Sequence, residues 1–275
     1  MSAGPSGHGS ERSEESEGRG SSAANHAGVD ERGAAKGKRR KAFNSISMKL
    51  LGFDTSSDYL VLGISDGERL LYRESILLGR RHSTEIFSFL EEALKHSKLT
   101  LQELDGFVVG QGPGSFTGLR IGISVAKTLA YSLKKPLVAI PTMDVLAEPF
   151  RSESVPICPI LDAKRNQVYT CLYQGNGKTL KRTTGYQLTP VEPFVKTLKG
   201  KVLFLGEGLR LYQEEIQELK KDEALFAPEK FWIPSPEHLL SLGRVRFEQK
   251  QFDDPFHLVP LYVYPRDCMI KKKQP

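Results

Sequence analysis

The stretch GQGPGSFTGLRIG at residues 110–122 places five glycines and a proline directly before a segment with the pattern of a helix. A glycine-rich turn that opens a helix often binds phosphate, because the backbone N–H groups of the first turn face the anion. This stretch, however, lacks the Lys-Ser/Thr ending of a P-loop and does not follow the G-x-G-x-x-G spacing of dinucleotide-binding folds. Phosphate binding is therefore the minor interpretation of these glycines.

Small residues continue from this turn into the helix at a spacing of four: Gly114, Gly118, Gly122, Ala126 and Ala130. This spacing places all five on one stripe of a helix, where another segment can approach closely. Glycine inside a helix costs roughly 1 kcal/mol relative to alanine, so a contact should compensate for it. The periodicity leaves two interpretations equally open. The stripe packs inside the chain, or it receives the helix of a partner.

Composition limits the class of protein. The chain has 275 residues and a net charge of +6, part of which lies in the runs at 36–41 and 271–273. A mildly basic chain can contact nucleic acid, but solvated charge runs explain the excess equally well. No stretch has the roughly 18 uninterrupted apolar residues of a membrane helix. Cys158, Cys171 and Cys268 show no paired spacing and are expected to be buried thiols in a reducing compartment. We expect a cytoplasmic protein without membrane association.

A change in composition divides the chain. Residues 1–47 are rich in Ser, Gly, Ala and charge, and they offer too little apolar surface to offset the entropy of ordering. Met48 stands where folded-type sequence begins and is a candidate start of translation. The predicted organisation is a disordered extension at 1–47, an N-terminal domain at 48–151, a C-terminal domain at 152–267 and a basic tail at 268–275.

The order of elements predicted for the first domain is β-β-β-α-β-α-β-α, which indicates a mixed sheet with helices on it. Three strands follow one another over 49–77, with a turn at Asp66-Gly67. A helix over 82–97, a strand over 106–110, a helix to Leu133, a strand over 137–140 and a helix over 142–150 complete it. The second half shows paired strands within 155–174, a strand at 201–206 and helical patterns at 211–221 and 236–249. We expect it to be a related copy of the first half.

Five stretches resemble the TsaB (YeaZ) family of the bacterial machinery that makes threonylcarbamoyladenosine in tRNA. They are LLGFDTSSD (50–58), RHS (81–83), GPGSFTGLRIG (112–122), AIPTMDVLA (139–147) and PLYVYPRD (260–267). The resemblance covers about 49–267, and its third stretch is the most specific. It implies an α/β protein of the actin/Hsp70-like (ASKHA) fold, with two related domains that each carry a mixed sheet and flanking helices.

The resemblance also implies a non-catalytic paralogue of the catalytic subunit TsaD. TsaD-like proteins carry a pair of metal-binding histidines in an H-x-x-x-H motif. The corresponding positions here are Thr142 and Leu146, whose side chains cannot bind a metal as imidazoles do. We therefore expect no catalytic residue, no metal and no cofactor in this chain, with ATP and a metal on partner subunits. The expected partners are a TsaD-like subunit, a TsaE-like ATPase, tRNA through the complex, and a second copy of this chain when it is alone. The modified base would be the adenosine next to the anticodon of tRNAs reading ANN codons.

In this family the first two helices form a bundle with the equivalent helices of the partner. The resemblance thus favours the docking interpretation of the small-residue stripe. It adds three residues of the helix at 82–97 to the docking surface: His82, Ile86 and Phe89.

Two minor assignments remain. Asp54, Thr55 and Ser56 lie where ATP-using members of the fold place a carboxylate and a phosphate-facing turn, although Ser56 stands where a glycine would let phosphates approach. Asp162, with Lys164 and Arg165, is expected to form a turn between strands whose basic residues could meet RNA. The alternative function is an ATP-dependent phosphotransferase of the sugar-kinase type on the same fold. A peptidase has no Ser/His/Asp arrangement or H-E-x-x-H motif to support it.

Overall fold

The computed structural model describes residues 47–78 and 82–263, except for the side chains of 82–84. These residues belong to one unit, 44–275. The predicted extension, apart from its last residue, and the predicted basic tail with Cys268 lie outside the described residues.

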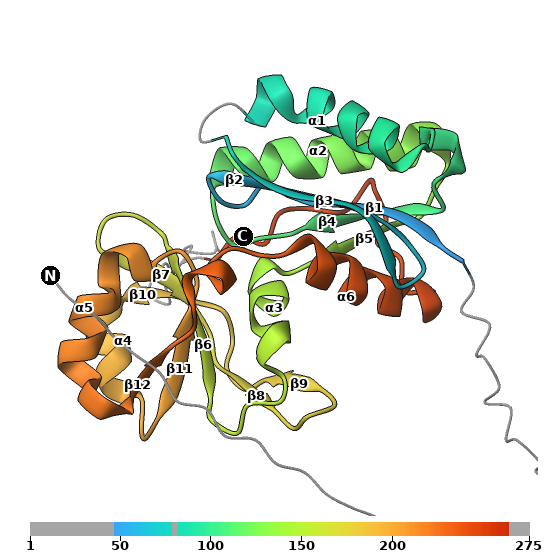
Figure 1. Ribbon diagram of the computed structural model, residues 1–275. Helices are drawn as coiled ribbons and strands as arrows, with labels where there is room; N and C mark the ends of the chain where they lie inside the picture. Colours follow the sequence, from blue (N-terminus) through green and yellow to red (C-terminus); the bar gives the residue numbers. More distant parts are fainter. Residues whose placement is uncertain (1–46, 79–81, 264–275) are drawn as a thin grey trace, which may run out of the picture. The chain divides into compact units, whose positions relative to one another are not determined.

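The first sheet has five strands in the order β3-β2-β1-β4-β5 (Figure 1). β1, β2 and β3 form an antiparallel meander, whereas β4 and β5 run parallel to β1. The strands are β1 (Lys49–Asp54), β2 (Tyr59–Asp66), β3 (Arg69–Leu77), β4 (Gly106–Gly110) and β5 (Leu137–Ile140). Gly67 closes the β2–β3 turn with φ of 59°, a conformation that glycine adopts at no steric cost. The strand predictions for this half are confirmed.

Helices cover both faces of the first sheet. α1 (His82–Ser97) and α2 (Phe116–Leu133) lie on one face, and α6 (Pro236–Glu248) lies on the other (Figure 1). Because side chains alternate along a strand, β1 sends Leu51 and Phe53 into the core under α1 and α2 and Leu50 into the core against α6. This two-sided burial explains why β1 is a continuous apolar run. The sequence placed α6 in the second domain, but its apolar side packs on the first sheet.

The second sheet repeats the first. Its main path is β10-β7-β6-β11-β12, with β7 and β10 antiparallel and β11 and β12 parallel to the central strand β6. Counted along the chain, both sheets therefore have the order third-second-first-fourth-fifth. The strands are β6 (Ile157–Asp162), β7 (Gln167–Thr170), β10 (Gln187–Pro190), β11 (Val202–Leu205) and β12 (Ala224–Phe226). The predicted relation between the two halves is confirmed by this shared topology.

The connections also correspond between the halves. α4 (Val191–Thr197) follows the third strand of the second sheet, as α1 does in the first, and α5 (Leu209–Lys220) follows the fourth, as α2 does. A hairpin is added at the side of β6, formed by β8 (Tyr173–Gly175) and β9 (Leu180–Arg182). α3 (Thr142–Ala147) connects the halves, and it packs Met143, Leu146 and Ala147 with β6 and Val145 with α6. Short 3₁₀ turns are η2 (Leu101–Glu103), η3 (Glu148–Phe150), η4 (Lys221–Glu223) and η5 (Glu229–Phe231).

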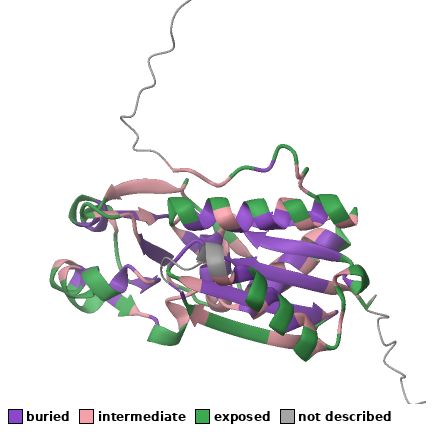
Figure 2. Cartoon of the chain, turned by 90° about the horizontal axis from the view of Figure 1, so that it is seen from above, coloured by how far each residue is buried: buried purple, intermediate pink, exposed green. Residues whose placement is uncertain are grey.

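The strands form the buried interior and the helices carry the exposed faces (Figure 2). Cys158 and Cys171 are fully buried, as expected, and burial raises the pKa of the Cys158 thiol to about 12. Within 47–78 and 82–263, no helix combines the length and the apolar character that a membrane crossing requires.

Candidate functional site

The glycine-rich turn is fastened to the turn that follows β1. Ser115 caps α2 by accepting a hydrogen bond from the Gly118 N–H (3.2 Å), and its own N–H donates to the Ser56 carbonyl (2.6 Å). One turn further along α2, the Thr55 hydroxyl donates to the Gly118 carbonyl (2.7 Å). These bonds hold the start of α2 directly over the end of β1.

The glycines of the stripe make this close approach possible. A Cβ built on Gly118 would lie 2.0 Å from the Thr55 carbonyl oxygen, and one on Gly122 would lie 2.2 Å from the Thr55 hydroxyl. Gly114 is equally tight against the Ser56 carbonyl, at 2.1 Å. Each distance is far below a van der Waals contact. At Gly114 and Gly118 the obstructing atom is a backbone oxygen, so only glycine fits there, whereas a side chain at Gly122 would displace the Thr55 hydroxyl. The stripe therefore packs inside the chain.

This packing corrects the assignment of the stripe to an exposed docking surface. Gly118, Gly122, Ala126 and Ala130 are buried, and the two alanines belong to the core between α2 and the first sheet. Ile86 is fully buried in the same core, and Phe89 packs against it. The side chain of His82 lies outside the described residues. Docking of a partner stays a prediction, and its surface has to be sought on the outer side chains of these helices.

The carboxylate of Asp54 joins three segments of the interior. Its Oδ2 accepts a hydrogen bond from the Thr142 hydroxyl at the start of α3 (2.6 Å), and its Oδ1 accepts one from the Ser56 N–H (2.7 Å). It also lies over Gly110, where a Cβ would come within 2.1 Å of the carboxyl group. Asp54, Thr55 and Thr142 are each 1% exposed. The hydrogen bonds of Asp54 are thus internal ones, and the assignment of this turn to a nucleotide stays a prediction.

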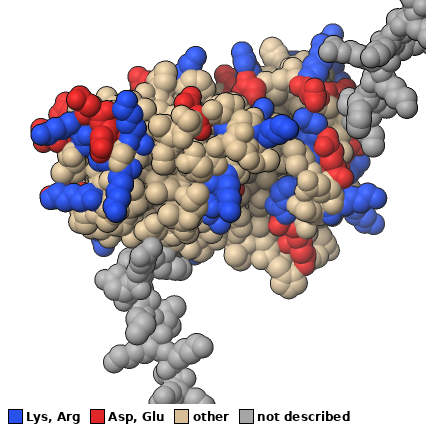
Figure 3. Space-filling view, turned by 90° about the horizontal axis from the view of Figure 1, so that it is seen from below, with Lys and Arg blue, Asp and Glu red and all other residues tan. Residues whose placement is uncertain are grey.

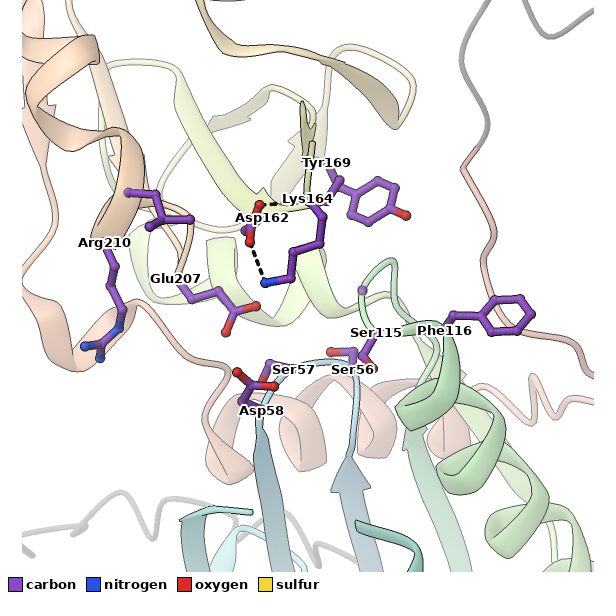
Figure 4. A pocket seen from close by; sticks show the side chains of 13 residues that line it. Ser56, Ser57, Asp58, Ser115, Phe116, Asp162, Lys164, Tyr169, Glu207 and Arg210 are labelled. Carbon is purple, nitrogen blue, oxygen red and sulfur yellow. Dashed lines mark hydrogen bonds and ion pairs between the residues drawn. The ribbon is translucent and has the colours of Figure 1, made fainter. Parts of the chain in front are cut away.

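A cleft of about 520 Å³ opens beyond this turn (Figure 4). The β1–β2 turn and the start of α2 line one side, through Ser56, Ser57, Asp58, Ser115 and Phe116. The β6–β7 turn and the β11–α5 turn line the other, through Asp162, Lys164, Tyr169, Glu207 and Arg210. The first strands of the two sheets, β1 and β6, both end at this cleft. The carboxyl ends of strands are where α/β sheets usually bind ligands.

Carboxylates dominate the charge inside the cleft. Asp58 and Glu207 point toward one another from opposite sides, and Asp162 lies beside them (Figure 4). The Lys164 ammonium pairs with Asp162 (2.6 Å), and Arg210 pairs with Glu229 outside the cleft (2.7 Å). Both basic side chains that the described residues contribute to the cleft wall, Lys164 and Arg210, are therefore already engaged.

The surroundings of Glu207 disfavour its charged form. Burial raises its pKa from 4.5 to about 7, and the negative charge of Asp58 adds to the rise, while Lys164 opposes it. The negative charges of Asp58 and Asp162, which add to this rise, would also repel the several negative charges of a polyphosphate.

The predicted turn between strands at 162–166 is confirmed, and its backbone is unusual. Lys164, Arg165 and Asn166 have φ values of 65°, 56° and 57°, the left-handed region that non-glycine residues rarely occupy. The Asp162 carboxylate stabilises this turn by accepting a hydrogen bond from the Lys164 N–H (2.8 Å). Contact of its basic residues with RNA stays a prediction. Acidic and basic side chains are interspersed on the face shown in Figure 3.

Sequence reasoning missed Asp58, Glu207 and Arg210. A signal for Glu207 was present, because it stands between Gly206 and Gly208 directly after a buried strand. Gly206 has φ of 104°, which favours glycine, and both glycines lie close against Ile160 of β6. A Gly-Glu-Gly sequence directly after a buried strand indicates that the backbone fixes the glutamate at the end of that strand. Pairing it with Asp58 required the fold.

The outer sides of α1 and α2 carry large exposed apolar side chains. Phe87 on α1 is 59% exposed, and Tyr131 on α2 is 64% exposed. At the start of α2, Phe116 is also exposed, and the Arg120 guanidinium lies 3.8 Å above its ring. Exposed aromatic side chains on two neighbouring helices are typical of a surface that binds another protein.

A strap formed by residues 253–263 lies along α2. The Asp253 carboxylate accepts a hydrogen bond from the Ala139 N–H of β5 (2.7 Å), and Leu258 is buried in the core under the helices. Lys127 then donates to the Leu258 carbonyl (3.1 Å), and Arg120 donates to the Tyr262 hydroxyl (3.0 Å). The strap includes the beginning of the PLYVYPRD stretch and leads toward the cleft.

Two sheets with one shared strand order, joined at a cleft where their first strands end, define an α/β protein of the actin/Hsp70-like class. A sequence model of the family described as "TsaD: tRNA N6-adenosine threonylcarbamoyltransferase" matches residues 77–271. The tRNA threonylcarbamoyladenosine biosynthesis protein TsaB of Bacillus subtilis is 32% identical over 219 residues, which are 78% of this chain and 94% of the relative. The Escherichia coli protein of the same name is 26% identical over 236 residues, 83% of this chain and 99% of the relative. This chain belongs to the TsaB (YeaZ) family.

The solved structures agree on the fold. YeaZ from Pseudomonas aeruginosa superposes with a TM-score of 0.68 at 23% identity, covering 78% of this chain and all of that chain. The predicted fold class is therefore confirmed. Among the described residues, no group of three or more His, Cys, Asp or Glu side chains is arranged to hold a metal ion.

Proposed function

We propose that this protein is a non-catalytic subunit in the biosynthesis of threonylcarbamoyladenosine in tRNA, and that it acts by binding a TsaD-type catalytic subunit. The names of the TsaB relatives support the pathway. The observation that carries the non-catalytic role is the environment of Thr142 and Leu146. These residues stand at the positions where a TsaD-like protein is expected to carry its two metal-binding histidines.

Neither residue fits a metal ion. The Thr142 hydroxyl is buried and donates to Asp54, and Leu146 is 2% exposed and packs in the core between α3 and the second sheet. A neutral hydroxyl that is already engaged and a hydrocarbon side chain supply no ligand of the kind that a transition metal prefers. ATP and the metal of the reaction are accordingly assigned to the partner subunits.

The phosphotransferase alternative is disfavoured by the cleft. A kinase of this fold needs cations and backbone N–H groups around the transferred phosphate. Here Asp58, Asp162 and Glu207 line the cleft, while Lys164 pairs with one of these carboxylates. The full chain alone should therefore show negligible ATPase and kinase activity. Turnover well above background that Asp54→Ala abolishes would favour the phosphotransferase instead.

The proposed docking surface is the outer side of α1 and α2, centred on Phe87 and Tyr131. Burial of such aromatic side chains at an interface contributes more than most other contacts. The TsaE-like ATPase would join the resulting complex, which would act in the cytoplasm on the adenosine next to the anticodon of tRNAs reading ANN codons. When the partner is absent, the same surface would pair with a second copy of this chain.

Co-purification of the full chain with the TsaD-type subunit of the same organism tests the proposal. Phe87→Glu and Tyr131→Glu should each weaken the complex by about tenfold or more, because a charge would be buried at the interface. The matched control is Val245→Glu, which changes an apolar residue of comparable exposure (42%) on α6, on the opposite face of the sheet. All three variants should melt like the wild type.

Two results would count against the proposal in different ways. If no complex forms at micromolar concentrations, the function is wrong. If the complex forms and tolerates both glutamates as well as it tolerates the control, the function stands and the docking surface lies elsewhere.

A further inference from the structure

The acidic cleft continues into an apolar groove. The groove has a volume of about 240 Å³ and is lined by apolar side chains that include Leu119, Leu188 and Leu261. It shares Gly114, Phe116 and Tyr169 with the cleft, so the two form one continuous depression. One end of this depression is apolar, and the other carries the carboxylates of Asp58, Asp162 and Glu207.

The strap, residues 253–263, leads into the apolar end of this depression. The Leu261 N–H donates to the Gln111 carbonyl (2.9 Å), and the Gln111 amide donates to the Val259 carbonyl (3.1 Å). The Tyr262 ring packs against Phe116, with ring centroids 5.5 Å apart. The described chain stops at Val263, which is itself part of the groove wall. The residues that follow therefore start from within the depression.

The sequence of 264–275 is YPRDCMIKKKQP. After Arg266 and Asp267, its second half has the same order of chemistry as the depression, an apolar pair followed by three lysines. Tyr264, Met269 and Ile270 are apolar, and Lys271, Lys272 and Lys273 follow them. Twelve residues span at most about 40 Å when extended, which is enough to pass from the groove into the cleft. Lysines that follow an apolar run suit carboxylates that lie beyond an apolar groove.

We propose that residues 264–275 occupy this depression, with Met269 and Ile270 in the apolar groove and Lys271–Lys273 against the carboxylates of the cleft. Asp58 belongs to the first half of the protein, and Asp162 and Glu207 belong to the second. The segment thus bridges the two halves and fills the space in which other proteins of this fold class hold a small ligand. The cleft is an intramolecular docking site.

The native Cys268 makes the proposal testable in the full chain. A cysteine introduced by Ala163→Cys lines the cleft, and a second one, Leu211→Cys, lines it at a position that is 65% exposed. A disulfide forms only when the two Cα atoms come within about 7 Å. The buried Cys158 and Cys171 do not compete for it. Oxidised glutathione would drive the reaction at high dilution, with the linked peptides measured by mass spectrometry.

The matched control is Gln102→Cys, an exposed residue just before the start of β4. The cleft lies at the opposite ends of the strands. At least one cleft cysteine should link to Cys268 within the same molecule, and the control should remain at background. Charge reversal of all three lysines to glutamate should lower the linking rate by about tenfold, as three ion pairs of about 0.5 kcal/mol each predict, and 1 M NaCl should act in the same direction.

Three results would overturn the proposal. Equal linking of the cleft cysteines and the control would show that the segment has no preferred place. Linking that is unaffected by charge reversal would remove the role of the carboxylates. Linking mainly between two molecules would assign the cleft to a second copy of the chain.

Discussion

Replacement of Gly118 by alanine adds one methyl group at the tightest point between α2 and β1. The new Cβ would lie 2.0 Å from the carbonyl oxygen of Thr55, whereas an ordinary contact begins near 3.4 Å. Helix and strand would therefore have to separate by roughly 1.4 Å at this point. Because the obstructing atom belongs to the backbone, no side-chain rotation relieves the clash.

Three contributions set the magnitude. Overpacking costs about 1–3 kcal/mol, and here the upper end applies because the clash is with backbone. Separation also weakens the hydrogen bond from the Thr55 hydroxyl to the Gly118 carbonyl, which adds about 1 kcal/mol. Alanine in place of glycine returns about 1 kcal/mol of helix propensity. The free energy of unfolding should fall by about 2–3 kcal/mol.

Thermal melting followed by circular dichroism measures this change. For a chain of this size, 1 kcal/mol corresponds to about 2–4 °C, so the Tm should fall by about 4–12 °C. Ser124→Ala is the matched control, because Ser124 lies exposed on the same helix and alanine there should be neutral or slightly stabilising. A Gly118→Ala protein that melts at or above the wild-type temperature would refute the internal packing of the stripe.

Two further predictions concern Glu207 in the cleft and the buried Thr142. The raised pKa of Glu207 means that its contribution to stability is fully present below about pH 4.5 and is lost as the pH rises through 7. Glu207→Gln should therefore exceed the wild type in urea-unfolding free energy by up to about 3 kcal/mol at pH 8 and by little at pH 4.5; a pH-independent difference would contradict the environment described for this carboxyl. Thr142→Ala should lower stability by about 1–3 kcal/mol, because the buried Asp54 loses a hydrogen-bond donor, whereas Thr142→Ser should retain most of it. Equal melting temperatures for these two variants would show that the hydroxyl contributes little.

The sequence was sufficient for most of the first half, because its elements carry local signals. β1 to β3 follow an apolar pattern interrupted by Asp66-Gly67, and the helix at 82–97 was predicted with the bounds that the structure gives to α1. The second half was harder, because several of its strands have only three or four residues. A run of that length carries too little periodicity, so the relation between the halves appears in the strand order and not in the residue pattern.

The small-residue stripe shows where periodicity stops being informative. A spacing of four identifies which residues share one side of α2, but it does not say what lies against that side. The answer depends on Thr55 and Ser56, about sixty residues earlier in the chain. The same holds for the cleft, because Asp58 and Glu207 are about 150 residues apart and become neighbours only when two sheets meet.

The backbone fold determines where the cleft lies, and the side chains that line it determine which ligands it can bind. β1 and β6 both end at the cleft, on its opposite sides, so the space in which this fold class holds a ligand is present. The side chains of this cleft do not suit a phosphate ligand. The Asp54 carboxylate accepts a hydrogen bond from Thr142, and the open part of the cleft is lined by further carboxylates. Phosphate recognition needs cations and N–H donors in that space. The Lys164 ammonium is already paired with Asp162, so little positive charge is left for a phosphate. A cleft lined by Asp58, Asp162 and Glu207 is better suited to binding a basic protein segment than to phosphoryl chemistry, so the basic residues after the strap are the place to test at the cleft. The exposed aromatic side chains of α1 and α2 are a separate surface, and they are the place to test the binding of a partner.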